Sequence, residues 1–190
     1  MNSASARLRN PKDTNPLHSC PERIYALDGG HVVIIDSAAA PACARRIAQL
    51  LPERHITLVV CAENSIDAAD VGLAAAACAR LVIYESSPPD AKPGEQAAFL
   101  ARFARSTART ECGIILDGSR ALRHCVDGMR QGHVIVYGSH EPQRAAEILR
   151  EYGAHAVSRI VGPRRAQSPR AKAGAGRAPS RRLAAIAGGL

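Results

Sequence analysis

Short apolar runs alternate along the chain with segments whose apolar residues recur at helical spacing. The strand-like runs are 31–36, 56–61, 81–84, 113–116 and 133–137, with a weaker run at 156–161. The helical segments between them are 41–51, 66–79, 94–109, 119–130 and 141–152. Strands that are apolar on both faces need cover on both faces. The alternation therefore predicts a doubly wound α/β fold, with a Rossmann-like parallel sheet of five or six strands in three layers.

The helical segment 119–130 has the clearest periodicity. Leu122, Cys125, Val126 and Met129 fall on one face, which predicts that this face packs in the core. Ser119 precedes this face and has a hydroxyl that can accept a hydrogen bond from a first-turn amide, so it is a candidate N-cap.

Composition divides the chain into three parts. A length of 190 residues with 46% hydrophobic content suits one domain with a core. We expect a disordered N-terminal segment at 1–20, the Rossmann-like domain at 21–162, and a disordered basic tail rich in Ala, Gly, Pro and Arg at 163–190. No apolar run reaches the roughly 20 residues that cross a bilayer, and 1–20 lacks the apolar block of a secretory signal. These patterns predict a cytoplasmic protein with no membrane contact.

The basic charge of the chain is concentrated in the predicted tail. The formal net charge is +8, and seven cations within 164–182 account for nearly all of it. Clustered cations in a flexible segment bind phosphates by releasing counterions, so any nucleic-acid contact is predicted there and not on the globular part. The candidate residues are Arg164, Arg165, Arg170, Lys172, Arg177, Arg181 and Arg182.

The cysteines and histidines carry no metal-binding or catalytic spacing. The six cysteines form no CxxC pair, and the seven histidines form no HxH or HExxH pair. Cysteines on apolar faces behave as small hydrophobic residues, and Cys61 at a strand end is interpreted in this way. The sequence therefore predicts no metal site and assigns no catalytic residue.

Polar residues follow the predicted strands. Ligands of open parallel sheets bind beyond the carboxyl ends of the strands, where free helix amides can also hold an anion. Two interpretations of these polar residues stay open. They bind a ligand, or they cap the helices that follow the strands, as acids and serines at these positions often do. In an enzyme, Asp36, Asp117 and His140 would act as acid, base or metal ligand. The candidate ligand-binding residues are Asp36, Ser37, Glu63, Glu85, Asp117, Gly118, Ser119, Arg120, Ser139 and His140.

The first strand-to-helix turn, 35–41, contains no glycine. It therefore has neither the GxGxxG fingerprint of dinucleotide-binding domains nor a GxxxxGK[ST] phosphate loop. This absence disfavours a conventional NAD-binding domain or ATPase.

An alanine-rich helix runs into a short apolar strand at Asp70–Tyr84, and related patterns follow at Glu95–Phe103 and Gly113–Arg120. On these segments, residues 57–129 resemble the adenine nucleotide alpha-hydrolase-like domain of electron-transfer flavoprotein subunits. The resemblance implies that Gly118, Ser119 and Arg120 lead into a helix over a nucleotide site, with AMP or FAD as the cofactor.

Two functions are expected from these observations. The first is a non-catalytic binding module, associated with a nucleotide or flavin and resembling an electron-transfer flavoprotein subunit domain. The alternative is a regulatory or scaffolding protein that binds a protein partner, or forms a homodimer, while its basic tail contacts nucleic acid.

Overall fold

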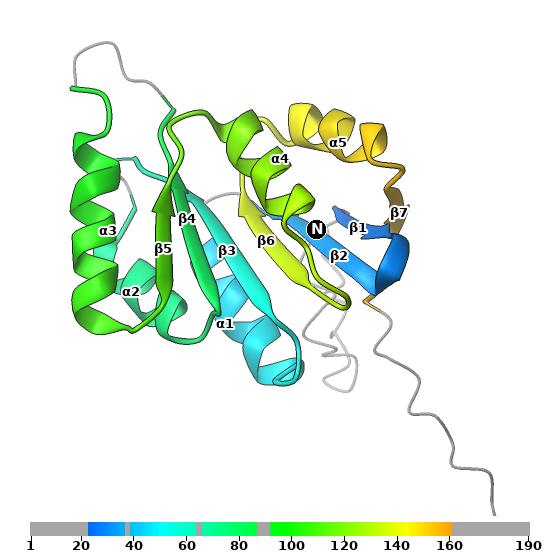
Figure 1. The fold of residues 1–190 in the computed structure, drawn as a ribbon, viewed down its shortest axis with the longest axis horizontal. Helices are drawn as coiled ribbons and strands as arrows, with labels where there is room; N and C mark the ends of the chain where they lie inside the picture. Colours follow the sequence, from blue (N-terminus) through cyan, green and yellow to red (C-terminus); the bar gives the residue numbers. More distant parts are fainter. Residues whose placement is uncertain (1–22, 37–38, 64–65, 87–91, 161–190) are drawn as a thin grey trace, which may run out of the picture.

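A computed structural model describes residues 23–36, 39–63, 66–86 and 92–160. It contains one seven-stranded sheet with the order β5-β4-β3-β6-β2-β1-β7 (Figure 1). Five neighbouring strands, from β5 to β2, run parallel, and β1 pairs antiparallel with both β2 and β7. The strands are β1 (Ile24–Leu27), β2 (His31–Asp36), β3 (Ile56–Cys61), β4 (Arg80–Tyr84), β5 (Glu111–Ile114), β6 (Val134–Gly138) and β7 (His155–Val157).

Helices cover both faces of the sheet, which gives three layers (Figure 1). One face packs against α1 (Ala40–Leu50), α2 (Ala68–Ala76) and α3 (Glu95–Thr107). The other packs against α4 (Gly118–Asp127) and α5 (Pro142–Glu151). The predicted doubly wound α/β class is confirmed, with one strand more than expected.

The core consists of two apolar layers, one on each side of the sheet. Successive strand residues point to opposite faces, so Leu58 faces α1–α3 whereas Val59 faces α4 and α5. Both are fully buried, as is Leu122, which α4 inserts into the second layer. Each such side chain contributes about 1.5 to 3 kcal/mol through burial.

The sheet departs from the sequence prediction at its edges. β1 was not predicted, because its four residues are too few to show a period; it turns into β2 through η2 (Asp28–Gly30), where Gly29 and Gly30 have φ near +74° and +73°. β5 was predicted at 113–116 but lies two residues earlier. Polar Glu111 is part of this edge strand and pairs with Arg80 at 3.2 Å.

The predicted tails, 1–20 and 163–190, and all seven candidate nucleic-acid residues lie outside the described residues. Within the described ranges, every helix is too short or too polar to cross a membrane.

Candidate functional site

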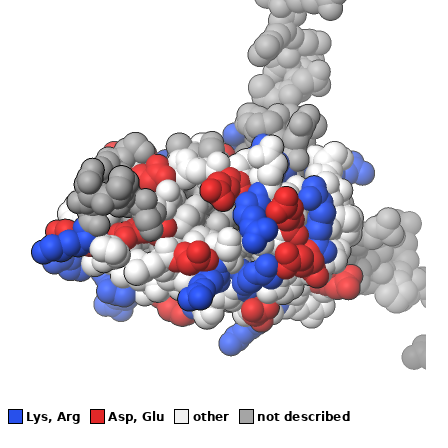
Figure 2. Space-filling view, turned by 90° about the horizontal axis from the view of Figure 1, so that it is seen from above, with Lys and Arg blue, Asp and Glu red and all other residues white. Residues whose placement is uncertain are grey.

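Two neighbouring cavities open at the carboxyl edge of the sheet, the upper edge in Figure 1. The first, called the α1–α2 cavity, has a volume of about 250 Å³ and lies between these two helices and the ends of β3 and β6. The second, the α4–α5 cavity, has a volume of about 480 Å³ and lies beside the starts of α4 and α5. His140 lines both. Figure 2 looks onto this edge and shows acidic and basic side chains intermixed on it.

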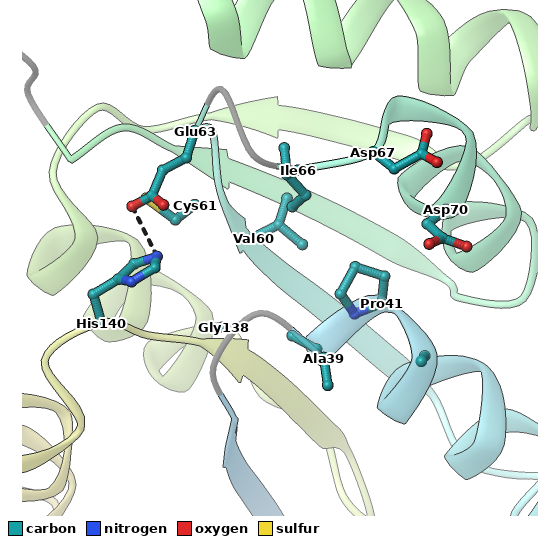
Figure 3. Close-up of a pocket in the computed structure, with 12 residues that line it drawn as sticks. Ala39, Pro41, Val60, Cys61, Glu63, Ile66, Asp67, Asp70, Gly138 and His140 are labelled. Carbon is teal, nitrogen blue, oxygen red and sulfur yellow. Dashed lines mark hydrogen bonds and ion pairs between the residues drawn. The ribbon is translucent and has the colours of Figure 1, made fainter.

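The α1–α2 cavity has an apolar middle and polar groups at its two ends (Figure 3). Val60, Ile66 and Pro41 line the middle. Three further groups of different chemistry, Cys61, Glu63 and His140, gather at one end, and Asp67 and Asp70 lie at the other. A ligand in this cavity would contact an apolar surface flanked by charge.

The first end is built around one carboxylate oxygen. Glu63 Oε1 lies 2.8 Å from His140 Nε2 and accepts a hydrogen bond from the Cys61 thiol at 3.5 Å. Burial raises the pKa of the Cys61 thiol to about 11, with a smaller contribution from the charge of Glu63. Cys61 is therefore a protonated thiol at neutral pH and a poor nucleophile in this state.

The second end carries two carboxylates with different partners. Asp67 is the N-cap of α2, since its side chain accepts a hydrogen bond from the amide of Ala69 at 2.8 Å. Asp70 pairs with Arg45 of α1 at 3.4 Å, and both side chains are partly exposed. Exposed ion pairs of this kind contribute little to stability, so a ligand can compete for the Asp70 carboxylate.

The α4–α5 cavity contains two stacked tyrosines. The rings of Tyr84 and Tyr137 lie 5.7 Å apart, and their hydroxyls donate to the carbonyls of Gly138 at 2.7 Å and Gly118 at 3.0 Å. Burial raises the pKa of Tyr137 to about 12 and that of Tyr84 further above its usual range. A Cβ at Gly118 would lie 2.8 Å from the Tyr84 ring, so this glycine permits a close approach.

Two predicted ligand residues prove to be helix caps. Buried Glu85 accepts hydrogen bonds from the amides of Gly94 at 2.5 Å and Ala97 at 2.9 Å, at the start of α3. Asp117 accepts from the amide of Arg120 at 2.6 Å and is the N-cap of α4. The expected N-cap, Ser119, was therefore wrong, because the helix already begins at Gly118.

The structure brings only part of the predicted set together. Glu63 and His140 meet in the α1–α2 cavity, while six of the predicted residues, His140 among them, line the α4–α5 cavity. The described residues that line the two cavities do not include Asp36 or Arg120, so the trio Asp36, Asp117 and His140 does not share one of them. Ser37 lies outside the described residues. The six are Glu85, Asp117, Gly118, Ser119, Ser139 and His140, which is common to both cavities.

Sequence analysis missed Cys61 as a site residue, together with Asp67, Asp70, Tyr84 and Tyr137. One signal in the sequence could have indicated that Cys61 and Glu63 act together. They are two residues apart, and in an extended chain residues i and i+2 point to the same side. Their approach to His140 depends on β3 and β6 being neighbours, which the sequence does not show.

Comparison with known proteins finds likeness in fold alone. No protein-family model matches the chain, and no curated protein does. Over 70% of its length, the chain is similar to 29% of a murein peptide ligase from Psychrobacter arcticus, with a TM-score of 0.52 and 12% identity. It also resembles 31% of a folylpolyglutamate synthase from Thermotoga maritima over 74% of its own length, with a TM-score of 0.47 and 14% identity. The chain thus matches less than a third of either protein.

The fold match to the murein peptide ligase corrects the expected resemblance to electron-transfer flavoprotein subunits. The alanine-rich helix and the strand after it are present as α2 and β4, but this layout is shared by many α/β folds and does not identify a family. The nucleotide- or flavin-associated binding module, and with it the electron-transfer assignment, was wrong. The scaffolding alternative gains no support from the fold match to the murein peptide ligase either.

Proposed function

We propose that this chain is the substrate-binding domain of a ligase-type protein. In this proposal the α1–α2 cavity holds an amine-bearing substrate, such as an amino acid or a short peptide. The observation that carries the proposal is the combination of an apolar middle with acidic ends in one cavity.

The charge of the cavity favours a cationic ligand. Glu63, Asp67 and Asp70 contribute three carboxylates, and the described lining residues include neither Lys nor Arg. An exposed ion pair contributes about 0.2 to 1 kcal/mol. The carboxylates therefore determine that the ligand carries an ammonium group, but they add little to its affinity. The same charge repels phosphate, in agreement with the missing glycine-rich loop in the turn 35–41.

The apolar middle supplies the remaining contacts. Val60, Ile66 and Pro41 offer a surface to the aliphatic part of an amino acid or peptide. Cavities that bind small molecules combine such a surface with a few polar groups that fix orientation. An aliphatic amine satisfies both requirements of this cavity.

The fold neighbour supports a ligase over other amine-binding proteins. A ligase that joins a peptide to another molecule must hold that peptide, and the ligase from Psychrobacter arcticus is named for such a reaction. Because fold alone does not define function, the cavity carries the proposal and the likeness supports it. The cytoplasmic location, the protein partner or homodimer and the domain limits 21–162 stay predictions.

The test compares one peptide in two forms. Isothermal titration of the full chain uses alanyl-alanyl-lysine with its amino groups free and the same peptide with both acetylated, in chelator-treated buffer. We expect binding of the free peptide and at least about tenfold weaker binding of the acetylated one, which is about 1.4 kcal/mol.

Matched variants locate the binding. Asp70→Asn removes a cavity carboxylate and leaves Arg45 unpaired nearby, so it should weaken binding of the free peptide. Glu53→Gln changes an exposed acid in the turn before β3, at the other end of that strand, and should leave binding unchanged. Equal binding of the two peptides, or no binding at millimolar concentration, would contradict the proposal.

A further inference from the structure

Cys61, Glu63 and His140 place three different metal-ligand atoms at one end of the α1–α2 cavity (Figure 3). The Sγ, the carboxylate oxygen and the imidazole nitrogen all lie within 4.8 Å of one another. Among the described residues, this is the one group of three or more His, Cys, Asp or Glu side chains that meets this condition. Cys61 ends β3 and Glu63 follows it, whereas His140 follows β6, 77 residues after Glu63 in the chain.

Two of the three separations are close to those around a tetrahedral zinc ion, and the third, between Sγ and the imidazole nitrogen, is within 4.8 Å. Zinc bonds of about 2.3 Å to sulfur and about 2.0 Å to oxygen or nitrogen place sulfur and oxygen about 3.5 Å apart, and nitrogen and oxygen about 3.3 Å apart. The observed Sγ–Oε1 distance is 3.5 Å and the Nε2–Oε1 distance is 2.8 Å. A cation therefore requires the imidazole of His140, whose side chain is 49% exposed, to move about half an ångström away from Glu63 Oε1.

We propose that Cys61, Glu63 and His140 form a binding site for a zinc-class divalent cation. When the Cys61 sulfur bonds to the cation, the thiol proton is released to solvent. The resulting thiolate and the imidazole favour zinc over magnesium or calcium, which prefer oxygen ligands alone. Three protein ligands leave a fourth position open, and because all three residues line the α1–α2 cavity, water or a ligand from the cavity can occupy it.

The scaffold supports this arrangement because two neighbouring strands hold the three residues. β3 and β6 are parallel and pair as far as Val59 and Tyr137, so continuing this register by two residues would set Cys61 opposite Ser139, the chain neighbour of His140. Cys61 ends β3 and is buried, whereas the side chains of Glu63 and His140 are 30% and 49% exposed. The buried Cys61 holds a fixed position, whereas the partly exposed side chains of Glu63 and His140 can adjust to a cation that enters from solvent.

The cation site and the amine site share Glu63, but they are tested separately. A bound cation would engage Glu63 and leave Asp67 and Asp70 at the opposite end of the cavity. It is therefore tested without any peptide, so that either proposal can fail alone. The spacing rules used in sequence analysis predicted no metal site, because the third ligand is remote in the chain.

The experiment uses cobalt, a spectroscopic substitute for zinc. The reduced full chain is titrated with Co²⁺, and absorption is followed for the thiolate-to-cobalt charge-transfer band and the visible bands of a tetrahedral ion. We expect one cobalt per chain with a thiolate band, and displacement by one equivalent of Zn²⁺. No thiolate band at millimolar Co²⁺ would overturn the proposal.

Variants assign the ligands. Cys61→Ser should remove the thiolate band. His140→Gln should weaken cobalt binding by about 100-fold, because losing a residue that only supports a metal ligand already costs about 10- to 100-fold in affinity. His140 is exposed enough for its variant to remain folded, which circular dichroism checks. The controls are Cys112→Ser and Cys20→Ser, the latter because His18 lies two residues away in sequence. A band that survives Cys61→Ser, or disappears in Cys20→Ser, would place the cobalt elsewhere and refute the assignment.

Discussion

Glu85 was predicted as a ligand-binding residue, and its contacts predict a different role that stability measurements can test. Its two carboxylate oxygens accept from the amides of Gly94 and Ala97, and the side chain is buried. Glu85→Ala leaves both amides at the start of α3 without this partner. A hydrogen bond to a charged group is worth about 1.5 to 3 kcal/mol, and rearrangement recovers part of the loss. We expect a total cost of about 2 to 4 kcal/mol.

The assay is urea and thermal unfolding of the full chain. At about 2 to 4 °C per kcal/mol, the melting temperature should fall by at least about 4 °C. The matched control is Glu95→Ala, which removes an exposed glutamate from the first turn of the same helix and should cost within about 0.5 kcal/mol. If Glu85→Ala and Glu95→Ala were equally stable, the capping role of Glu85 would be refuted.

Three further predictions concern the core, the tyrosine pair and pH. Leu122→Ala should lower the free energy of unfolding by about 2 to 5 kcal/mol, since Leu122 is fully buried on the inner face of α4. A smaller loss in urea unfolding would mean that the surrounding side chains close the cavity that the substitution leaves. Gly118→Ala should cost about 1 to 3 kcal/mol by forcing a Cβ to 2.8 Å from the Tyr84 ring, whereas Gly113→Ala, with open space around its Cβ, serves as the tolerated control in thermal melts. Burial and the nearby His55 lower the pKa of His133 below its ordinary 6.5, so the unfolded chain takes up a proton before the folded one does. Stability should therefore fall as the pH drops below about 6.5, and a melting curve series that is unchanged by His133→Gln would contradict this assignment.

The sequence was sufficient for the strands and helices that are buried and periodic. β2 and β3 have the predicted bounds, 31–36 and 56–61, because strands covered on both faces must be apolar throughout. Strands at the edge of the sheet, or next to it as β1 is, lack this constraint. β1 has four residues and β5 begins at a charged one, so neither produced a signal that matched its bounds.

The site was predictable by position but not by grouping. The rule that ligands bind at the carboxyl ends of parallel strands found Glu63 and His140. It did not show that β6 inserts between β2 and β3, and this strand order is what brings His140 to Cys61 and Glu63. It also did not separate these two from Glu85 and Asp117, which occupy equivalent positions but turn toward helix amides.

The most direct test of the central claim is amide chemical-shift mapping of the full chain during titration with the free-amine peptide. The account predicts that the largest shifts cluster in the described residues around the α1–α2 cavity, at 61–63, 66–70 and 138–140, and that the acetylated peptide produces much smaller shifts there. Shifts that instead centre on Ser119 and Arg144 in the α4–α5 cavity, or that are the same for both peptides, would contradict it.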